Sequence, residues 1–180
     1  ANETATSAPR NEFLKHMKQC CLDIDSTRLI TAAFDLVRFN RESRNFEMND
    51  SIINILDMVA INKYMGWYHD WPLAPDQAVW NVAPGKPLFI SEFGGDAEVK
   101  SSWSEDYQAQ LYKDNLEMFK HIPNLRGTSP WILLDFRSPF RFHPHQGGEW
   151  NRKGLVSDQG QRKKAWYIMR DYYNQKKTEQ

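Results

Sequence analysis

The stretch Pro87-Leu-Phe-Ile-Ser-Glu92 and the Phe93-Gly-Gly95 turn after it decide the predicted fold. The run is apolar along its length rather than alternating, which is typical of a strand buried on both faces of a parallel sheet. It ends in a carboxylate, which is costly to bury unless it is hydrogen-bonded or used in chemistry. The two glycines let the backbone approach a ligand closely. We therefore predict a buried strand whose carboxyl end carries either a structural acid or a catalytic one.

Three further apolar runs flank this strand, at residues 28–34, 57–62 and 128–136. We predict a helix over 11–24, before the first run. Between the runs we predict a loop over 38–50, a brief helix over 75–82, and a long helix that begins at a Ser102 and Glu105 capping box and ends at Pro123. A last helix follows the final run. Strands that alternate with helices predict an α/β fold with a parallel sheet covered by helices. Four such units make half of a (β/α)8 barrel.

The apolar spacing gives three of these helices an inward face. The predicted inward residues are Phe13, Leu14, Met17, Cys21 and Ile24; Tyr112, Leu116 and Phe119; and Ala165, Ile168, Met169 and Tyr172. The only cysteines, Cys20 and Cys21, are adjacent on a predicted helix, where their side chains point apart, so we expect no structural disulfide.

Composition narrows the class of partner. The 180 residues include 23 Lys and Arg against 23 Asp and Glu, which argues against nucleic acid and favours a small neutral or anionic ligand. Seven Trp, seven Tyr and ten Phe are many for this length, and flat aromatic faces stack on sugars, although most of them are expected in the core. No apolar run is long enough to cross a membrane, so no membrane partner is expected. One domain is the expected organisation.

Polar and aromatic residues follow the predicted strands where the chemistry of parallel sheets is found. These segments are Asn62-Lys-Tyr-Met-Gly-Trp-Tyr68, Ser91-Glu-Phe-Gly-Gly95, Trp131 with Asp135, and Asn2-Glu3 near the start. The first resembles the Asn-Arg-Tyr-Tyr-Gly-Trp-Tyr at the end of the sixth strand in β-glucuronidases of glycoside hydrolase family 2. Ala1-Asn2-Glu3 resembles the Asn-Glu that closes the fourth strand of that family, and Ile90-Ser-Glu-Phe-Gly94 the end of its seventh. Trp131 takes an eighth-strand position.

The resemblance implies a retaining β-glycosidase with Glu3 as acid/base and Glu92 as nucleophile. Two carboxyl groups roughly 5 to 5.5 Å apart perform this chemistry, one attacking the anomeric carbon and the other protonating the leaving oxygen. Glu92 must then be ionised and Glu3 must start protonated. By resemblance, Asn2 binds the sugar 2-hydroxyl and Tyr64 orients Glu92. The substrate-binding set implied is Asn2, Asn62, Tyr64, Tyr68, Trp131, Asn151 and Lys153, with no cofactor and no metal.

The identity of the sugar depends on Asn151-Arg152-Lys153, which matches by position an Asn-x-Lys pair that binds the glucuronate carboxylate in β-glucuronidases. An ammonium and an amide form charge-assisted hydrogen bonds to a carboxylate. In the alternative interpretation Asn151 caps a turn and Lys153 is solvated, and some β-galactosidases of the family carry a similar segment. The predicted substrates are therefore β-D-glucuronides, with β-galactosides as the alternative.

Four other groups are weaker candidates. His143 and His145 with Glu149 form an incomplete metal set, so a polar loop is expected instead. Arg137 and Arg141 are expected in surface salt bridges rather than at the sugar. The run Arg162–Lys164 is expected to be a solvated face. The remaining group, Trp67, Trp71 and Trp80, suits distal sugar subsites and packing under loops equally well.

Residues 1–180 are thus expected to form strands five to eight of a partial (β/α)8 barrel, the C-terminal half of a catalytic domain. A full barrel takes about 250 residues, so the other half is expected in the same parent chain or by association, because open sheet edges invite pairing. The chain alone is predicted to show little turnover. The rival hypothesis is a non-catalytic carbohydrate-binding half-barrel in which Glu3 is frayed and far from Glu92. The compartment stays open, with a bacterial cytoplasmic or periplasmic enzyme suspected.

Overall fold

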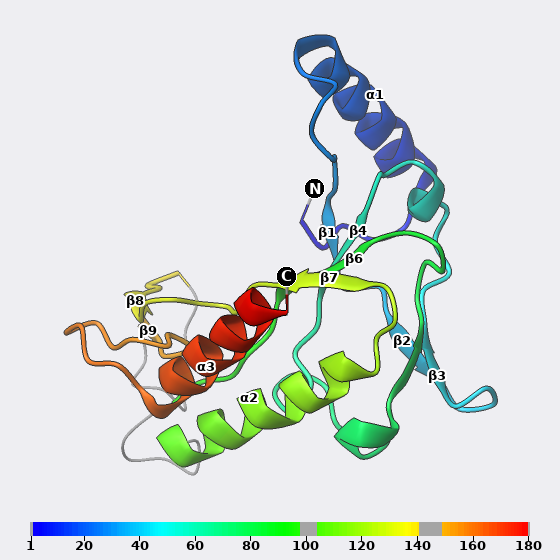
Figure 1. The fold of residues 1–180 in the computed structure, drawn as a ribbon. Helices are drawn as coiled ribbons and strands as arrows, with labels where there is room; N and C mark the ends of the chain where they lie inside the picture. Colours follow the sequence, from blue (N-terminus) through cyan, green and yellow to red (C-terminus); the bar gives the residue numbers. More distant parts are fainter. Residues whose placement is uncertain (1, 98–103, 141–148, 180) are drawn as a thin grey trace. The chain divides into compact units, whose positions relative to one another are not determined.

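The structure is a computed structural model that describes residues 2–97, 104–140 and 149–179 (Figure 1). The chain divides into two compact units. Unit 1 contains residues 1–63, 72–92 and 119–128, and unit 2 contains residues 64–71, 93–118 and 129–180.

Unit 1 is built on a four-stranded sheet in the order β1-β4-β6-β7. Its strands are β1 (Ala33–Phe34), β4 (Val59–Asn62), β6 (Leu88–Glu92) and β7 (Leu125–Thr128), and every neighbouring pair is parallel (Figure 1). All four residues of β4 are buried, as are Leu88 and Ile90 of β6. Continuous apolar runs therefore form buried parallel strands, as the sequence predicts.

The carboxyl ends of β4 and β6 are in register, with Asn62 paired to Glu92 after a register shift at Ile61. The Lys63 amide continues this pairing by donating to the Glu92 carbonyl oxygen at 2.8 Å. The polar residues that follow the two strands are thereby brought to one edge of the sheet.

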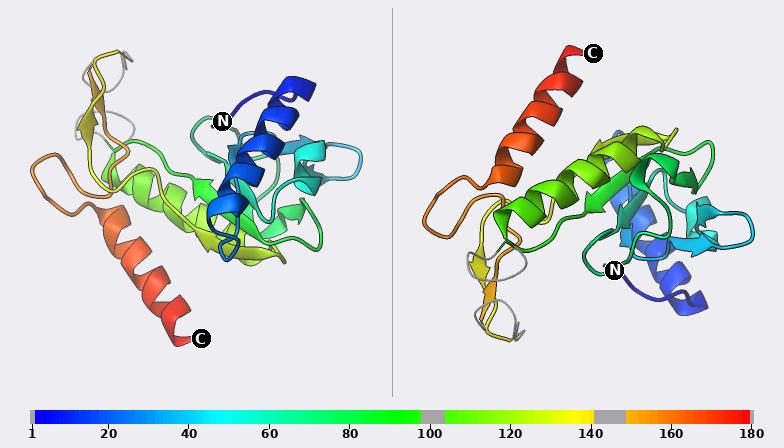
Figure 2. Two further views of the ribbon diagram at one scale, coloured as in Figure 1. Left: turned by 90° about the horizontal axis from the view of Figure 1, so that it is seen from above. Right: turned by 90° about the horizontal axis from the view of Figure 1, so that it is seen from below.

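The second sheet of unit 1 corrects two predictions. It contains β2 (Arg38–Asn40), β3 (Asn45–Glu47) and β5 (Val79–Asn81), so a hairpin occupies most of the predicted loop 38–50 (Figure 2). The turn between β2 and β3 forms because the Asn40 side chain accepts hydrogen bonds from the Glu42 and Ser43 amides.

The predicted helix over 75–82 is also wrong beyond its first turn. Only the 3-10 helix η2 (Pro75–Gln77) forms, and β5 follows it directly. Trp80 of β5 is buried and stacks on Phe46 of β3, with 5.0 Å between the ring centroids. Packing of the Trp80 ring on the hairpin therefore outweighs the helical pattern.

Helix α1 (Ala8–Ile24) starts three residues before the predicted boundary because the Ser7 side chain accepts from the Arg10 amide and caps it. Its predicted inward face is largely exposed: Leu14 is buried, whereas Phe13, Met17 and Ile24 are exposed at 54%, 42% and 89%. Polar contacts anchor the helix instead.

Two ion pairs join α1 to the segment around the 3-10 helix η1 (Ser51–Asn54). Arg10 contacts Asp50 at 2.6 Å with both side chains buried, and Lys18 contacts Asp57 at 2.5 Å. Burial raises the pKa of Asp50, but hydrogen bonds from Arg10, Thr6 and the Ile52 amide outweigh it and hold that pKa below its ordinary value. Asp50 is therefore a charged anchor inside unit 1.

Unit 2 contains residues 105–118 of helix α2 (Glu105–Lys120), the helix α3 (Lys164–Thr178) and an antiparallel pair of β8 (Phe136–Arg137) and β9 (Trp150–Asn151). The Tyr107 amide donates to the Ser104 side chain at the start of α2, while Ser102 of the predicted capping box lies outside the described residues. On α3, Ala165 and Met169 are buried and Ile168 and Tyr172 partly so, which confirms the predicted inward face.

The predicted strand over 128–136 is wrong in most of its length. The parallel strand β7 already ends at Thr128, and of the run only Phe136 belongs to a later strand, β8. Pro130 lacks the N–H group that a sheet ladder needs, which accounts for the interruption. In the described part of the chain no helix has the length and apolar character needed to cross a membrane, and both cysteines are free.

Candidate functional site

A hydrogen-bonded group of polar side chains lies at the carboxyl ends of the unit 1 strands. Asn62, fully buried at the end of β4, is at its centre. Its amide nitrogen donates to Oε1 of Glu3 at 2.9 Å and to Oδ1 of Asn2 at 3.2 Å. Its amide oxygen accepts from Oγ of Ser91 at 2.6 Å. One side chain thus connects the predicted acid/base with strand β6.

Glu3 is held in place rather than frayed. Its backbone N–H donates to the Ala33 carbonyl of β1 at 2.9 Å, and its side chain accepts from Asn62. Its φ of 49° lies in the left-handed region, which non-glycine residues seldom adopt. The Glu3 side chain is solvent-exposed, so it is free to meet a ligand.

Glu92, the predicted nucleophile, is the last residue of β6 and is partly buried. The preceding residue, Ser91, donates a hydrogen bond to Asn62. Asn62 is also the residue paired with Glu92 in the register of β4 and β6. Glu3 and Glu92 are therefore tied to the same strand end of unit 1 through Asn62. A two-carboxylate reaction needs its two acids close together, and both of these residues belong to the same end of the unit 1 sheet.

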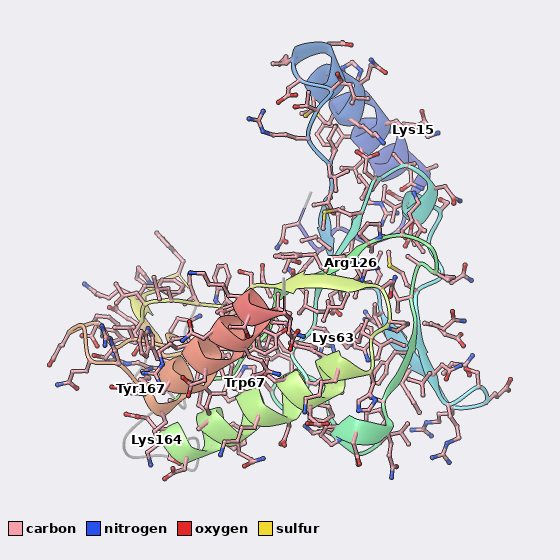
Figure 3. The ribbon with its side chains drawn as sticks, viewed as in Figure 1. Lys15, Lys63, Trp67, Arg126, Lys164 and Tyr167 are labelled. Atoms are coloured by element: carbon pink, nitrogen blue, oxygen red, sulfur yellow. The ribbon has the colours of Figure 1, made fainter. Side chains whose placement is uncertain are left out.

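Lys63, which is labelled in Figure 3, stands where the resembled β-glucuronidase segment has an arginine. Its ammonium is buried, donates to the Val37 carbonyl at 3.0 Å, and lies 3.7 Å from Asp35. Burial lowers the pKa of Lys63 to about 8, against the opposing attraction of Asp35. The side chain is thus bound between β4 and the segment that leads to the hairpin.

The predicted carboxylate-recognition residues, Asn151 and Lys153, lie in unit 2, and Lys153 is only 1% exposed. Its ammonium contacts Oδ2 of Asp96 at 3.1 Å. It also lies 4.9 Å from the ring centroid of Trp67 and 5.2 Å from that of Tyr68, within the range of cation–π attraction. The alternative in which Lys153 is solvated is therefore excluded.

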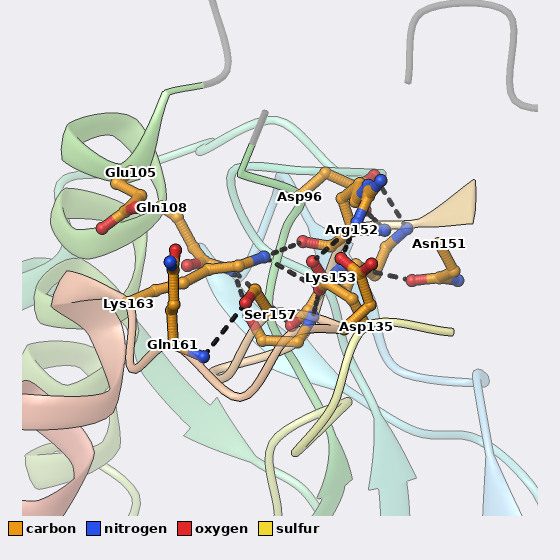
Figure 4. Close-up of polar contacts among 12 residues, drawn as sticks. Asp96, Glu105, Gln108, Asp135, Asn151, Arg152, Lys153, Ser157, Gln161 and Lys163 are labelled. Carbon is orange, nitrogen blue, oxygen red and sulfur yellow. Dashed lines mark hydrogen bonds and ion pairs between the residues drawn. The ribbon is translucent and has the colours of Figure 1, made fainter. Parts of the chain in front are cut away.

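The backbone around Lys153 is fixed from several sides (Figure 4). Asn151 is buried, and its side-chain oxygen accepts from the Lys153 amide at 3.2 Å, so the turn-capping role considered for it is present. The Arg152 amide donates to Oδ1 of Asp96 at 3.0 Å, and the Gly154 amide to Oδ1 of Asp135 at 2.8 Å. A side chain at Gly154 would meet the Asp135 backbone nitrogen at 2.3 Å, so only glycine fits there.

Asp135 and Lys163 complete this support. The Lys163 ammonium, also buried, contacts Asp135 at 2.8 Å and donates to the Arg152 carbonyl at 2.9 Å. Burial raises the pKa of Asp135, against the opposing effect of its hydrogen bond from Lys163. The prediction that residues 162–164 form a solvated face is wrong for Lys163, because Lys163 is buried and paired with the Asp135 carboxylate.

The predicted aromatic site residues also belong to unit 2. Tyr64 is buried and lies 5.1 Å, between ring centroids, from Tyr68, which is 51% exposed. The Trp131 amide donates to the Phe93 carbonyl at 2.8 Å, and the Trp131 ring is 6.3 Å from that of Phe136. Tyr68 thus combines contact with Lys153 and access to solvent.

The weaker candidates can be placed in part. Arg137 pairs with Glu149, and both side chains are more than half exposed, which confirms the expected surface salt bridge. Trp67 packs against Tyr107 at 6.4 Å between centroids. Arg141, His143 and His145 lie outside the described residues. Over residues 2–97, 104–140 and 149–179, no cluster of three or more His, Cys, Asp or Glu is arranged to hold a metal ion.

Asp96 was not singled out by sequence reasoning, although it is fully buried and touches both the side chain of Lys153 and the amide of Arg152. One signal was available. Asp96 follows Gly94-Gly95 directly, four residues after Glu92, and a buried acid near a predicted active segment needs a partner.

The chain is similar in sequence and in fold to several known proteins. No family model matches the chain. A β-glucuronidase from Streptococcus agalactiae is 30% identical over 201 aligned residues, which cover 99% of this chain and 32% of that protein. A structure of a family 2 β-galacturonidase from Eisenbergiella tayi with bound galacturonate is 25% identical, covers 97% of this chain and 32% of that one, and has a TM-score of 0.75. A β-D-glucuronidase structure from Dictyoglomus thermophilum, 21% identical with a TM-score of 0.73, shares the fold.

The resemblance to glycoside hydrolase family 2 is thereby confirmed. The chain is β-glucuronidase-like over nearly all of its length. It spans about a third of the length of the Streptococcus relative.

Proposed function

We propose that this chain belongs to a retaining β-glycosidase that releases a terminal uronic acid, with β-D-glucuronides as the first substrate class. The observation that carries the proposal is the Asn62 contact set, in which one buried amide binds Glu3 and the strand that ends in Glu92. The β-glucuronidase relatives support the same chemistry.

In the proposed mechanism, ionised Glu92 attacks the anomeric carbon while Glu3 gives its proton to the leaving oxygen. The bond from the anomeric carbon to the leaving group breaks, and an ester to Glu92 forms. Glu3, now a carboxylate, then removes a proton from water, which attacks the same carbon and releases Glu92. Asn62 holds the Glu3 carboxyl in position through both steps.

Asn151 and Lys153 are proposed to bind the sugar carboxylate. The buried Lys153 ammonium supports this role, because charge-assisted hydrogen bonds are strongest where water is excluded. A β-galacturonide is the second candidate substrate, since a galacturonidase of the family shares the fold of this chain. Both sugars carry the same carboxylate. A β-galactoside lacks it and would leave the ammonium without an anionic ligand.

The four parallel strands are proposed to be strands five to eight of a (β/α)8 barrel, and residues 1–180 the C-terminal half of its catalytic domain. The strand order β1-β4-β6-β7 follows the order along the chain, as in a barrel. The other half is proposed to come from the same parent protein or from an associated chain. By this proposal, the 180 residues alone show little turnover.

The test is hydrolysis of chromogenic β-glucuronide, β-galacturonide, β-galactoside and β-mannoside substrates by the parent protein. We expect turnover of uronides that falls by orders of magnitude in Glu92→Gln and Glu3→Gln. Glu47→Gln is the matched control, because it makes the same Glu-to-Gln exchange at a residue of the β2–β3 hairpin. Activity that survives Glu92→Gln would refute the proposal and favour a carbohydrate-binding role.

A further inference from the structure

Asp96 contacts both Lys153 and the residue before it, Arg152. Oδ2 of Asp96 contacts the Lys153 ammonium at 3.1 Å, and Oδ1 accepts from the amide of Arg152, the preceding residue, at 3.0 Å. Asp96 thus holds the side chain of Lys153 with one oxygen and the backbone of the preceding residue, Arg152, with the other.

This double contact matters because the ion pair is almost entirely shielded from water. The Lys153 and Asp96 side chains are 2% and 0% exposed. A buried ammonium needs an anionic or hydrogen-bonding partner, since the loss of hydration is otherwise uncompensated. The Trp67 and Tyr68 rings add cation–π attraction but accept no ordinary hydrogen bond from the ammonium.

The remaining supports of the segment act only on its backbone or on its neighbours. Asp135 binds the Gly154 amide, and Lys163 binds the Arg152 carbonyl. Among these supports, Asp96 is the group that also reaches the Lys153 ammonium (Figure 4).

We propose that Asp96 is a positioning residue that sets uronate specificity by holding the Lys153 ammonium where a sugar carboxylate binds it. The proposal rests on the proposed function and deepens it. An ammonium has three N–H donors, so one bond to Asp96 leaves donors for the ligand. Asp96 does not touch the reacting atoms in this proposal, and its effect passes through Lys153.

The measured quantity is the uronide preference of the parent protein, defined as kcat/KM for p-nitrophenyl β-D-glucuronide divided by that for the β-D-glucoside. The galacturonide and galactoside pair is measured in parallel. In Asp96→Ala we expect the preference to fall at least about tenfold, the effect of losing a hydrogen bond to a charged group. The loss should appear in the KM of the uronide, with the glucoside constants nearly unchanged.

Two further variants separate positioning from other effects. Asp96→Asn retains one acceptor oxygen in place of two and should give a preference between those of wild type and Asp96→Ala. Asp158→Ala is the matched control, because Asp158 is also an aspartate that contacts Arg152, but through the Arg152 side chain, at 2.5 Å. It should leave the preference unchanged.

A second readout does not depend on activity. The protein is treated with an amine-acetylating reagent, and the peptide that carries Lys153 is followed by mass spectrometry. Lys153 should be protected in wild type and Asp158→Ala and should react in Asp96→Ala.

An Asp96→Ala protein that keeps the wild-type preference, or in which Lys153 stays protected, overturns the inference. A preference that rises in Asp96→Asn also overturns it, because Asp96 would then compete with the ligand. A wild-type protein with no uronide preference refutes the proposed function instead, and the acetylation result still decides whether Asp96 holds Lys153.

Discussion

Replacing Asn62 by alanine removes the side chain that connects Glu3 with strand β6. The variant loses the hydrogen bond to the Glu3 carboxyl at 2.9 Å, the one to Asn2 at 3.2 Å, and the one from Ser91 at 2.6 Å. A hydrogen bond to a charged group contributes about 1.5 to 3 kcal/mol. If only the bond to Glu3 matters for the reaction, kcat should fall by roughly 10- to 150-fold, because about 1.4 kcal/mol corresponds to a factor of ten.

The assay is steady-state hydrolysis of the preferred β-uronide by the parent protein, with circular dichroism to confirm folding. We expect the loss in kcat rather than in KM, because Asn62 positions a reacting group. Asn62→Asp should be worse than Asn62→Ala, since it places a second carboxyl group against Glu3. Asn40→Ala is the control, because Asn40 also donates to a glutamate, Glu47, at 3.0 Å but lies on the hairpin.

A kcat within about threefold of wild type in Asn62→Ala would refute the reasoning, since such a change corresponds to less than 1 kcal/mol. Full activity in Asn62→Asp would refute it as well. In either case Glu3 would not depend on Asn62 for its position.

The remaining predictions concern stability. Asp50→Asn leaves the buried Arg10 without its anionic partner and should destabilise the protein by about 3 kcal/mol in urea unfolding, the low end for a broken buried pair; an unchanged midpoint would contradict this. Asp50 and Asp57 both have a folded-state pKa below their ordinary 3.8, so the stability they contribute is present above about pH 4 and lost as pH falls through the folded values. Urea midpoints measured across this range should fall less in Asp50→Asn than in wild type. Gly127→Ala places a methyl group 2.7 Å from the Phe89 ring and should cost about 1 to 3 kcal/mol by thermal melting, unless the ring moves freely aside.

Buried parallel strands were predictable because their signal is local. The apolar run before Glu92 forms β6, the run before Lys63 forms β4, and both end where polar residues begin. The position of Asn62 opposite Glu92 then follows from parallel pairing. Part of the candidate site was therefore accessible from sequence.

The missed features depend on contacts between distant residues. The β2–β3 hairpin has a polar sequence, and its pairing with β5 becomes favourable through the packing of Phe46 on Trp80. The sequence around Lys163 is typical of a charged surface, but Lys163 is buried because it pairs with Asp135, 28 residues away. Similarly, Asp96 gains its importance from Lys153, 57 residues later. The hydrophobic periodicity of a short segment cannot predict such pairings between distant residues.

Trapping of the covalent intermediate tests the central claim most directly. The parent protein is incubated with a 2-deoxy-2-fluoro-β-glucuronyl fluoride, which slows release of the glycosyl-enzyme, and the labelled peptide is identified by mass spectrometry. We predict time-dependent inactivation with the sugar attached to Glu92, and no adduct in Glu92→Gln. An adduct on another residue, or turnover of β-glucuronides without any trapped adduct, would contradict the assignment of Glu92 as the nucleophile of a retaining glycosidase.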